Sequence, residues 1–169
     1  MVIKFSDKLT TETFNDFADL FADGLNKTEQ GTKLKIFFTT SGGEVSCAYA
    51  LFELLNKYKE HIEFYVVDAM MSSGIILLYL MRDFDVYITD LDAELLIHKI
   101  HTKVNTSHPT KRQVEADINN YNKKLHNMFK RLGLSEDKLQ RFNNTEDVFL
   151  TVKELITMFP NIKVKKYLW

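Results

Sequence analysis

The sequence has a single cysteine, almost no net charge, and no apolar run long enough to cross a membrane. Cys47 has no second cysteine to pair with, which excludes an internal disulfide and favours a reducing, cytoplasmic environment. Lysine and arginine number 22 against 23 acidic residues, so no overall field attracts nucleic acid or anionic lipid. The longest apolar stretch, Gly74 to Met81, is far shorter than the roughly 20 residues that span a bilayer. We interpret it as a buried helix.

Signals for export and for nucleotide binding are also missing. Residues Met1 to Phe5 lack the basic segment, apolar run and small-residue cleavage site of an export signal. The stretch from Gly24 to Lys33 contains a Gly-Thr-Lys sequence but not the Gly-Lys-Ser/Thr spacing of a phosphate-binding loop. Any ATP dependence would therefore come from a partner. The length of 169 residues, without repeats or linkers, predicts one domain.

Apolar patterning predicts strands and helices that alternate along the chain. Strands are expected at residues 2–5, 34–38, 62–67, 85–88, 95–98 and 164–168. Helices are expected from residue 10, after the turn at 41–43, over 72–81 and over 110–132, followed by short helices capped by Ser135 and Thr151. This alternation is typical of an α/β fold with a mainly parallel sheet, whose working groups stand at the carboxyl ends of strands.

Ser72 is the candidate nucleophile of a serine hydrolase. It lies where the strand predicted to end at Val67 gives way to a helix, whose N-terminus favours negative charge. The backbone amides of Ser73 and Gly43 would serve as oxyanion donors, since a glycine leaves room for substrate. A Ser-Ser-Gly sequence at a helix start is nevertheless more often only an N-cap.

Hydrolysis by a serine also needs an imidazole and a carboxylate that orients it. His98 ends a predicted strand and is the candidate base, although a lone histidine there is more often a surface or core residue. Taken by itself, Asp147 is still weaker evidence for a catalytic site than His98.

The order and spacing of these residues resemble the ClpP family, the proteolytic subunit of the Clp protease, over nearly the whole chain. Residues 36–45 resemble the family's strand and Ser-Pro-Gly-Gly turn, 69–78 its nucleophile turn, 95–98 its histidine strand, and 145–151 its Asp-Arg-Asp-x-Phe-Met-Ser block. By this resemblance Ser72, His98 and Asp147 fall on the catalytic triad, and residues 110–132 match the handle helix.

The resemblance implies a ClpP/crotonase-type α/β fold: repeated ββα units with a twisted, mainly parallel sheet and a projecting handle helix. A single domain over residues 1–169 would have its head at about 1–100 and 134–169 and its handle at about 101–133. The implied activity is that of a serine endopeptidase that forms an acyl-enzyme on Ser72 and uses neither cofactor nor metal.

The resemblance also implies partners. Substrates would be peptides or unfolded proteins, the chain would form a homo-oligomeric ring or double ring, and an AAA+ unfoldase is a candidate partner. Neither nucleic acid nor a membrane is expected. We expect Gly42, Met71 and Lys99 to contact substrate beside the oxyanion donors.

Several positions depart from the family pattern and are expected to reshape the substrate pocket. Ser41 replaces a proline, Asp68 stands where a glycine precedes the nucleophile turn, and Met71 replaces a small residue. Residues 99–109 are polar and nearly glycine-free, where the family has Gln-Pro and a glycine-rich strand. No axial loop is seen ahead of the first strand. Ring stacking, peptide specificity and docking to an ATPase therefore stay open.

Rival interpretations are a catalytically silent ClpP-like scaffold subunit and, less favoured, a crotonase-type acyl-CoA enzyme, which would use two amides without a serine. A metal site would need His98, His101 and His108 with Asp90 or Asp92. It is disfavoured because strand residues three apart point to opposite faces. Cys47 is expected to be a small core residue. The basic residues Lys123, Lys124, Lys130 and Arg131 are interpreted as the solvated side of a helix.

Overall fold

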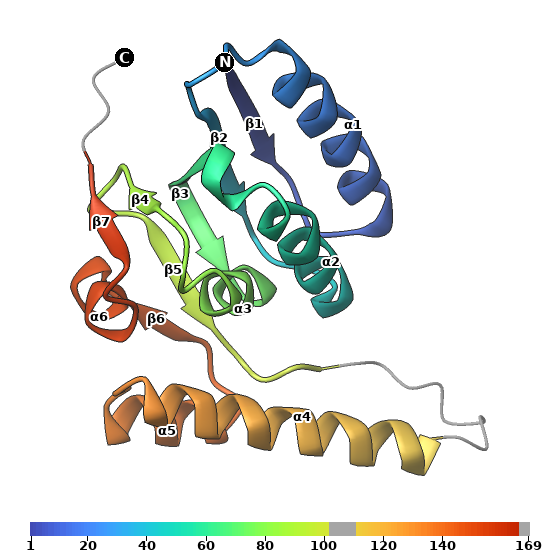
Figure 1. The fold of residues 1–169 in the computed structure, drawn as a ribbon. Helices are drawn as coiled ribbons and strands as arrows, with labels where there is room; N and C mark the ends of the chain where they lie inside the picture. The colour runs from blue at the N-terminus through green and yellow to red at the C-terminus, as the bar shows by residue number, and fades with distance from the viewer. Residues whose placement is uncertain (102–110, 166–169) are drawn as a thin grey trace. The chain divides into compact units, whose positions relative to one another are not determined.

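The computed structural model describes residues 1–101 and 111–165, which form helices and strands in alternation (Figure 1). The elements are β1 (Val2–Ser6), α1 (Thr11–Lys27), β2 (Leu34–Thr40), α2 (Val45–Asn56), η1 (Lys59–His61), β3 (Ile62–Met71), α3 (Ser73–Leu80), β4 (Val86–Ile88), β5 (Glu94–Ile97), α4 (Lys111–Arg131), α5 (Glu136–Asn143), β6 (Val148–Leu150), α6 (Val152–Met158) and β7 (Ile162–Val164). The chain divides into two compact units: a first unit of Met1–Leu96 with Phe149–Trp169, and a second unit of Ile97–Val148.

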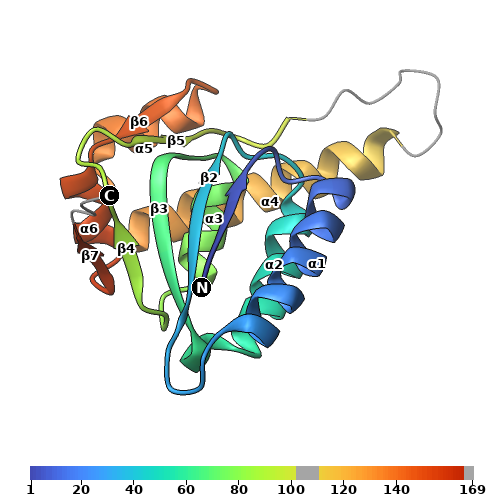
Figure 2. The ribbon, with the colours of Figure 1, turned by 90° about the horizontal axis from the view of Figure 1, so that it is seen from above.

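The sheet of the first unit is built from parallel pairs. Its main path runs β1, β2, β3, β4 and β7, and β5 pairs with both β3 and β6. Each pair of neighbours along this path is parallel, and so is the pair of β3 with β5. In Figure 2 the helices α1, α2 and α3 lie along the same face of the sheet. This arrangement confirms the predicted α/β class with a mainly parallel sheet.

Aromatic side chains join α1 to the sheet. Phe5 of β1 and Phe38 of β2 stack with their ring centroids 4.5 Å apart, and Phe17 of α1 meets both rings edge-on. Phe21, one helical turn later, stacks on Phe17. These four side chains are buried. Their spacing is what the 3.6-residue period of a helix over a pleated strand produces.

Strand β3 continues beyond the predicted boundary at residue 67, through a distortion. Phe38 pairs with Val66, but Thr40 pairs with Met70, so β3 carries extra residues at this point. Asp68 there has a φ of 59°, in the left-handed region that aspartate tolerates better than most residues. The Thr39 hydroxyl accepts a hydrogen bond from Ala69 N at 3.0 Å and donates one to Ala69 O at 3.2 Å. A side chain thus replaces the missing backbone partners.

The second unit contains α4 and α5, and α4 confirms the long helix expected at 110–132. Leu125 and Phe129 of α4 are buried, and the Phe129 ring meets Phe142 of α5 edge-on at 5.4 Å. Asn122 is also buried, and its side-chain amide bonds both backbone groups of Ile100: Ile100 N donates to Oδ1 at 2.8 Å, and Nδ2 donates to Ile100 O at 3.1 Å. Asn122 therefore fixes the segment that follows β5 as a neighbouring strand would.

The predicted caps are confirmed, whereas the last strand lies elsewhere. Thr151 forms the predicted capping box with Glu154, and Ser135 caps α5. The last strand lies at Ile162–Val164 rather than at 164–168, because these residues pair with Val86–Ile88 of β4; residues 166–168 lie outside the described part. Within the described residues, no helix is both long and apolar enough to cross a membrane.

Candidate active site

Ser72 occupies the turn between β3 and α3 with a strained backbone. Its φ of 54° and ψ of −117° lie outside the regions that residues with a side chain readily adopt. Although Ser72 is in the N-cap position of α3, its hydroxyl caps no backbone amide. The alternative that the Ser-Ser-Gly motif alone suggested, a serine that serves only as an N-cap, is therefore not supported. The hydroxyl is left available at the helix start, half-buried.

Gly42 packs directly against the Ser72 side chain. A β-carbon added at Gly42 would lie 2.5 Å from Ser72 Cβ, 2.8 Å from Met71 O and 3.2 Å from Ser72 Oγ. The φ of Gly42 is 93°, a conformation that favours glycine. Two independent reasons therefore favour glycine at position 42: a Cβ would collide with the serine turn, and the backbone has a positive φ. Met71, the last residue of β3, is half-buried next to the same turn.

The two predicted oxyanion donors, the backbone amides of Gly43 and Ser73, lack a hydrogen-bond acceptor for different reasons. Gly43 lies against Leu9, and the hydrogen bonds of this contact use Gly42 O, Glu44 N and both backbone groups of Leu9. Among the described residues, no acceptor takes the Gly43 amide. The amide of Ser73 is one of the first four in α3, and these have no acceptor within a helix.

The neighbouring hydroxyl of Ser73 is enclosed. Ser73 is 1 % exposed, and its Oγ is a buried atom without a hydrogen-bond partner. The Ser73 side chain therefore differs from that of Ser72, since it points into the core of the unit. Of the two adjacent serines, only Ser72 offers its hydroxyl at the surface.

His98 follows β5 directly, and its ring is oriented by a backbone carbonyl. Nδ1 lies 2.6 Å from Lys99 O. A carbonyl oxygen only accepts, so Nδ1 carries the proton and the neutral ring keeps its lone pair on Nε2. This is the tautomer that a general base acting through Nε2 requires.

Asp147 precedes β6 and is exposed. Its backbone carbonyl accepts a hydrogen bond from Arg141 Nη2 at 3.3 Å, and Arg141 Nε pairs with Glu146 at 3.0 Å. Among the described residues, no hydrogen bond joins the Asp147 carboxylate to His98. The place beside Nδ1 that a triad gives to its acid is taken by Lys99 O.

Lys99, expected to contact substrate, has a structural partner. Its ammonium donates to Asn143 O, the last carbonyl of α5, at 2.6 Å. A cation at this end of a helix also complements the helix dipole.

The predicted site residues divide between the two units. The first unit holds Gly42, Gly43, Met71, Ser72 and Ser73, and the second holds His98, Lys99 and Asp147. Within the first unit, Ser72 N donates to Leu96 O at 2.7 Å. The nucleophile turn is thus hydrogen-bonded to β5 two residues before His98.

Thr40 is a residue of this site that the sequence interpretation missed. Its Oγ1 accepts a hydrogen bond from Gly42 N at 3.1 Å, and the side chain is 2 % exposed. It holds the glycine turn that packs on Ser72. The only sequence signal was a threonine that ends a strand immediately before a glycine turn.

His98 and His101 lie side by side, with their ring centroids 6.0 Å apart and an interplanar angle of 3°. On a continuous strand these two side chains would point to opposite faces, but β5 ends at Ile97 and the strand alternation stops there. His108 lies outside the described residues, and within them no group of three His, Cys, Asp or Glu side chains is placed to hold a metal ion.

Cys47 is buried in α2, as expected. Burial raises the pKa of its thiol above the usual range, and the nearby Glu44 carboxylate raises it further. Because only the thiolate is a nucleophile, the thiol is unreactive at neutral pH.

Comparison with known proteins identifies the family. The profile of the Clp protease family matches residues 2–158, nearly the whole chain. The chain therefore belongs to the Clp protease family, and its mainly parallel α/β fold is consistent with the ClpP/crotonase type. Among curated proteins, none matches significantly.

Proposed function

We propose that the chain is a serine endopeptidase that cleaves peptides through an acyl-enzyme on Ser72. The observation that carries the proposal is the conformation of Ser72. Its backbone is strained, its hydroxyl caps nothing, and the space beside it is kept open by Gly42, where a Cβ would collide with Ser72 Cβ. Strain of about 1–3 kcal/mol at a polar residue persists only where the surrounding structure imposes it, and such residues cluster at active sites.

In the proposed reaction, His98 Nε2 takes the hydroxyl proton of Ser72 as Oγ attacks the carbonyl carbon of the peptide. The protonated ring then gives this proton to the leaving nitrogen as the carbon–nitrogen bond breaks. Water repeats both steps, which releases the acid and restores the serine. The Nδ1 contact with Lys99 O supports the neutral tautomer that the first step needs.

The amides of Gly43 and Ser73 would stabilise the oxyanion. Their freedom from other acceptors supports this role, as does the position of Ser73 at the start of α3. Asp147 is proposed to stabilise the charged imidazole once substrate is bound, when contacts of the apo site tighten. We further propose a homo-oligomeric ring in which the active sites face an enclosed chamber.

Labelling with a fluorophosphonate tests the nucleophile. We expect one label per chain, located on Ser72 by mass spectrometry, and loss of both labelling and peptide hydrolysis in Ser72→Ala. Ser46→Ala is the matched control, because Ser46 is an exposed serine of α2 in the same unit. Labelling of another serine, or hydrolysis that survives in Ser72→Ala, would refute the proposal.

A catalytically silent scaffold is the second candidate. The absence of a hydrogen bond between Asp147 and His98, which both lie in the second unit, favours it. Sedimentation and labelling on the same sample separate the two: a ring that takes the label is a peptidase, and a ring that does not is a scaffold. Binding of an acyl-CoA without labelling would instead support a crotonase-type enzyme.

A further inference from the structure

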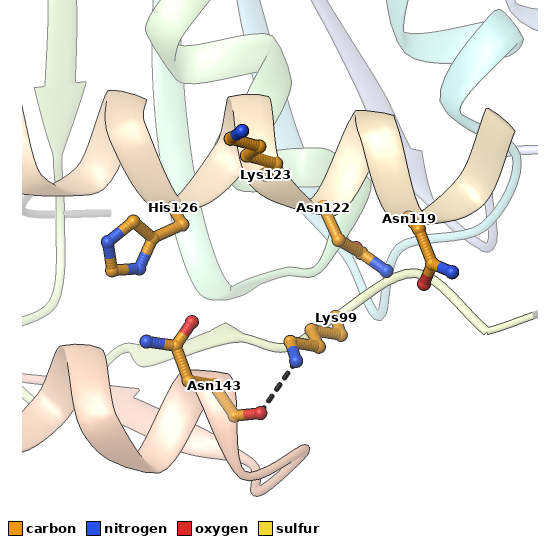
Figure 3. A pocket seen from close by; sticks show the side chains of 6 residues that line it. All are labelled: Lys99, Asn119, Asn122, Lys123, His126 and Asn143. Carbon is orange, nitrogen blue, oxygen red and sulfur yellow. Dashed lines mark hydrogen bonds between the residues drawn. The ribbon is translucent and has the colours of Figure 1, made fainter. Parts of the chain in front are cut away.

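The second unit contains an open cavity of about 280 Å³ between α4, α5 and the segment after β5. It is lined by Lys99, Asn119, Asn122, Lys123, His126 and Asn143. In Figure 3 the side chains of Asn119, Asn122 and His126 extend from α4 toward Lys99 and Asn143. The volume lies just below the usual range for small-molecule sites, so the cavity fits a ligand the size of one amino-acid residue.

The charge of the cavity is uncompensated. Two lysines line it and no acidic residue does. Lys99 donates to a neutral carbonyl, and Lys123 has only Asn119, Asn120, His126 and Asn127 at the helical spacings of three and four. Across the described part of the chain, no ion pair involves either lysine. An anion entering the cavity would thus meet positive charge without displacing a protein carboxylate.

His126 lines the cavity with a ring whose hydrogen bonding is incomplete. Its Nδ1 is buried and has no hydrogen-bond partner. A buried polar atom without a partner is costly, and proteins usually satisfy it or use it for a ligand. Asn122 behaves differently, since both ends of its amide are engaged by Ile100. Among the described residues, the side chains of Asn119, His126 and Asn143 are therefore the neutral polar groups of the lining that make no hydrogen bond.

We propose that this cavity binds a carboxylate carried by a peptide-like ligand, namely the side chain or the chain end of an acidic residue. The lysines recognise the carboxylate. The side-chain amides of Asn119 and Asn143 each present a donor and an acceptor, which matches the N–H and C=O of a peptide group. A phosphomonoester dianion presents acceptors and no donors, so it would leave the amide oxygens unmatched.

The site adjoins the residue after His98, so on the proposed function it would select acidic residues in substrates. The binding itself does not depend on that function, because every lining residue lies in the second unit and Ser72 does not. The experiment below therefore uses the Ser72→Ala chain alongside the natural one. A failure of binding and a failure of hydrolysis can then be told apart.

NMR spectra of the full chain, recorded at constant pH, test the proposal with a matched pair of ligands. N-acetyl-glutamate amide is expected to shift the ring resonances of His126 saturably, and more strongly at low salt. Its neutral counterpart, N-acetyl-glutamine amide, is expected to bind at least several-fold more weakly. Equal binding of the two, or no shift at His126, overturns the proposal and leaves a solvent-filled pocket.

Two lysine variants locate the charge. Lys123→Gln is expected to weaken binding about two- to fivefold, the effect of one exposed ion pair. Lys124→Gln is the matched control, since Lys124 is an exposed lysine on the same helix that does not line the cavity. Equal weakening by both variants overturns the proposal, because the attraction would then be non-specific.

Further ligands identify the source of the carboxylate. Binding of succinate as tight as that of N-acetyl-glutamate amide overturns the assignment to a peptide-like ligand, because succinate has no peptide group for Asn119 and Asn143 to recognise. Tighter binding of the peptide-like ligand supports the carboxylate site and assigns it to a peptide. Tighter binding of inorganic phosphate than of either carboxylate overturns the proposal.

Discussion

Replacing Gly42 with alanine tests the close packing behind Ser72. An alanine at a φ of 93° costs about 1–2 kcal/mol in backbone strain. The new Cβ would also lie 2.5 Å from Ser72 Cβ and 2.8 Å from Met71 O, so the turn must shift. Overpacking of this kind costs a further 1–3 kcal/mol or so. We therefore expect a total loss of about 2–5 kcal/mol in the free energy of unfolding.

Gly31→Ala separates the two contributions. Gly31 has a similar φ of 84°, but a Cβ there meets nothing within 4 Å. We expect this variant to lose only the backbone strain, about 1–2 kcal/mol. Urea denaturation of both variants measures the difference.

Reactivity of Ser72 provides the second measurement. A displacement of the hydroxyl by about 1 Å is expected to slow fluorophosphonate labelling of folded Gly42→Ala by on the order of a hundredfold. Gly31→Ala is expected to label at the natural rate. If the two variants lose equal stability and label equally fast, Gly42 does not position the serine, and the packing argument is wrong.

Three further substitutions or treatments probe other contacts. Asn122→Ala strips Ile100 of both partners and is expected to lower the unfolding free energy in urea by about 2–3 kcal/mol, since buried backbone groups lose their hydrogen bonds; a loss below about 0.5 kcal/mol would show that water replaces the amide fully. Thr39→Val removes both bonds to Ala69 and is expected to cost about 1–2 kcal/mol, whereas Thr39→Ser keeps most of that stability. Because the pKa of Cys47 is raised, its thiolate is scarce at pH 8, and labelling by a thiol reagent should be much slower than in urea and should still increase above pH 9; equal rates in the folded and unfolded chain would contradict this.

The helices and most strands could be predicted because local patterning decides them. In α1, Phe17 and Phe21 follow the helical period, and Thr10 caps the first turn. The extension of β3 could not be predicted in this way. It passes through Asp68, whose backbone conformation is unfavourable, and it depends on the hydroxyl of Thr39 from another strand. The apolar pattern contains no trace of such a contact.

At the candidate site, the sequence predicted residue types better than contacts. Ser72 was recognised by its place between a strand and a helix, but the strain of its backbone is a property of the folded turn. The acceptor at His98 Nδ1 was expected to be a carboxylate and is the carbonyl of Lys99. The backbone near that carbonyl is fixed by Asn122, which lies far along the chain. A resemblance to a family predicts which residue occupies each position of a site. It does not predict the hydrogen bonds to backbone atoms that orient those residues.

The interruption of the first unit between Leu96 and Phe149 bears on how the chain tolerates change. The strands at its two ends, β5 and β6, pair with each other, so the segment between them is a loop whose ends are held together. The entropic cost of closing such a loop grows only logarithmically with its length, by about 0.6 kcal/mol for each doubling. Extra helical turns in α4, or a whole inserted module beyond Ile97, would thus add little cost to the first unit. Variation in size is expected to accumulate there, while the nucleophile turn is left untouched.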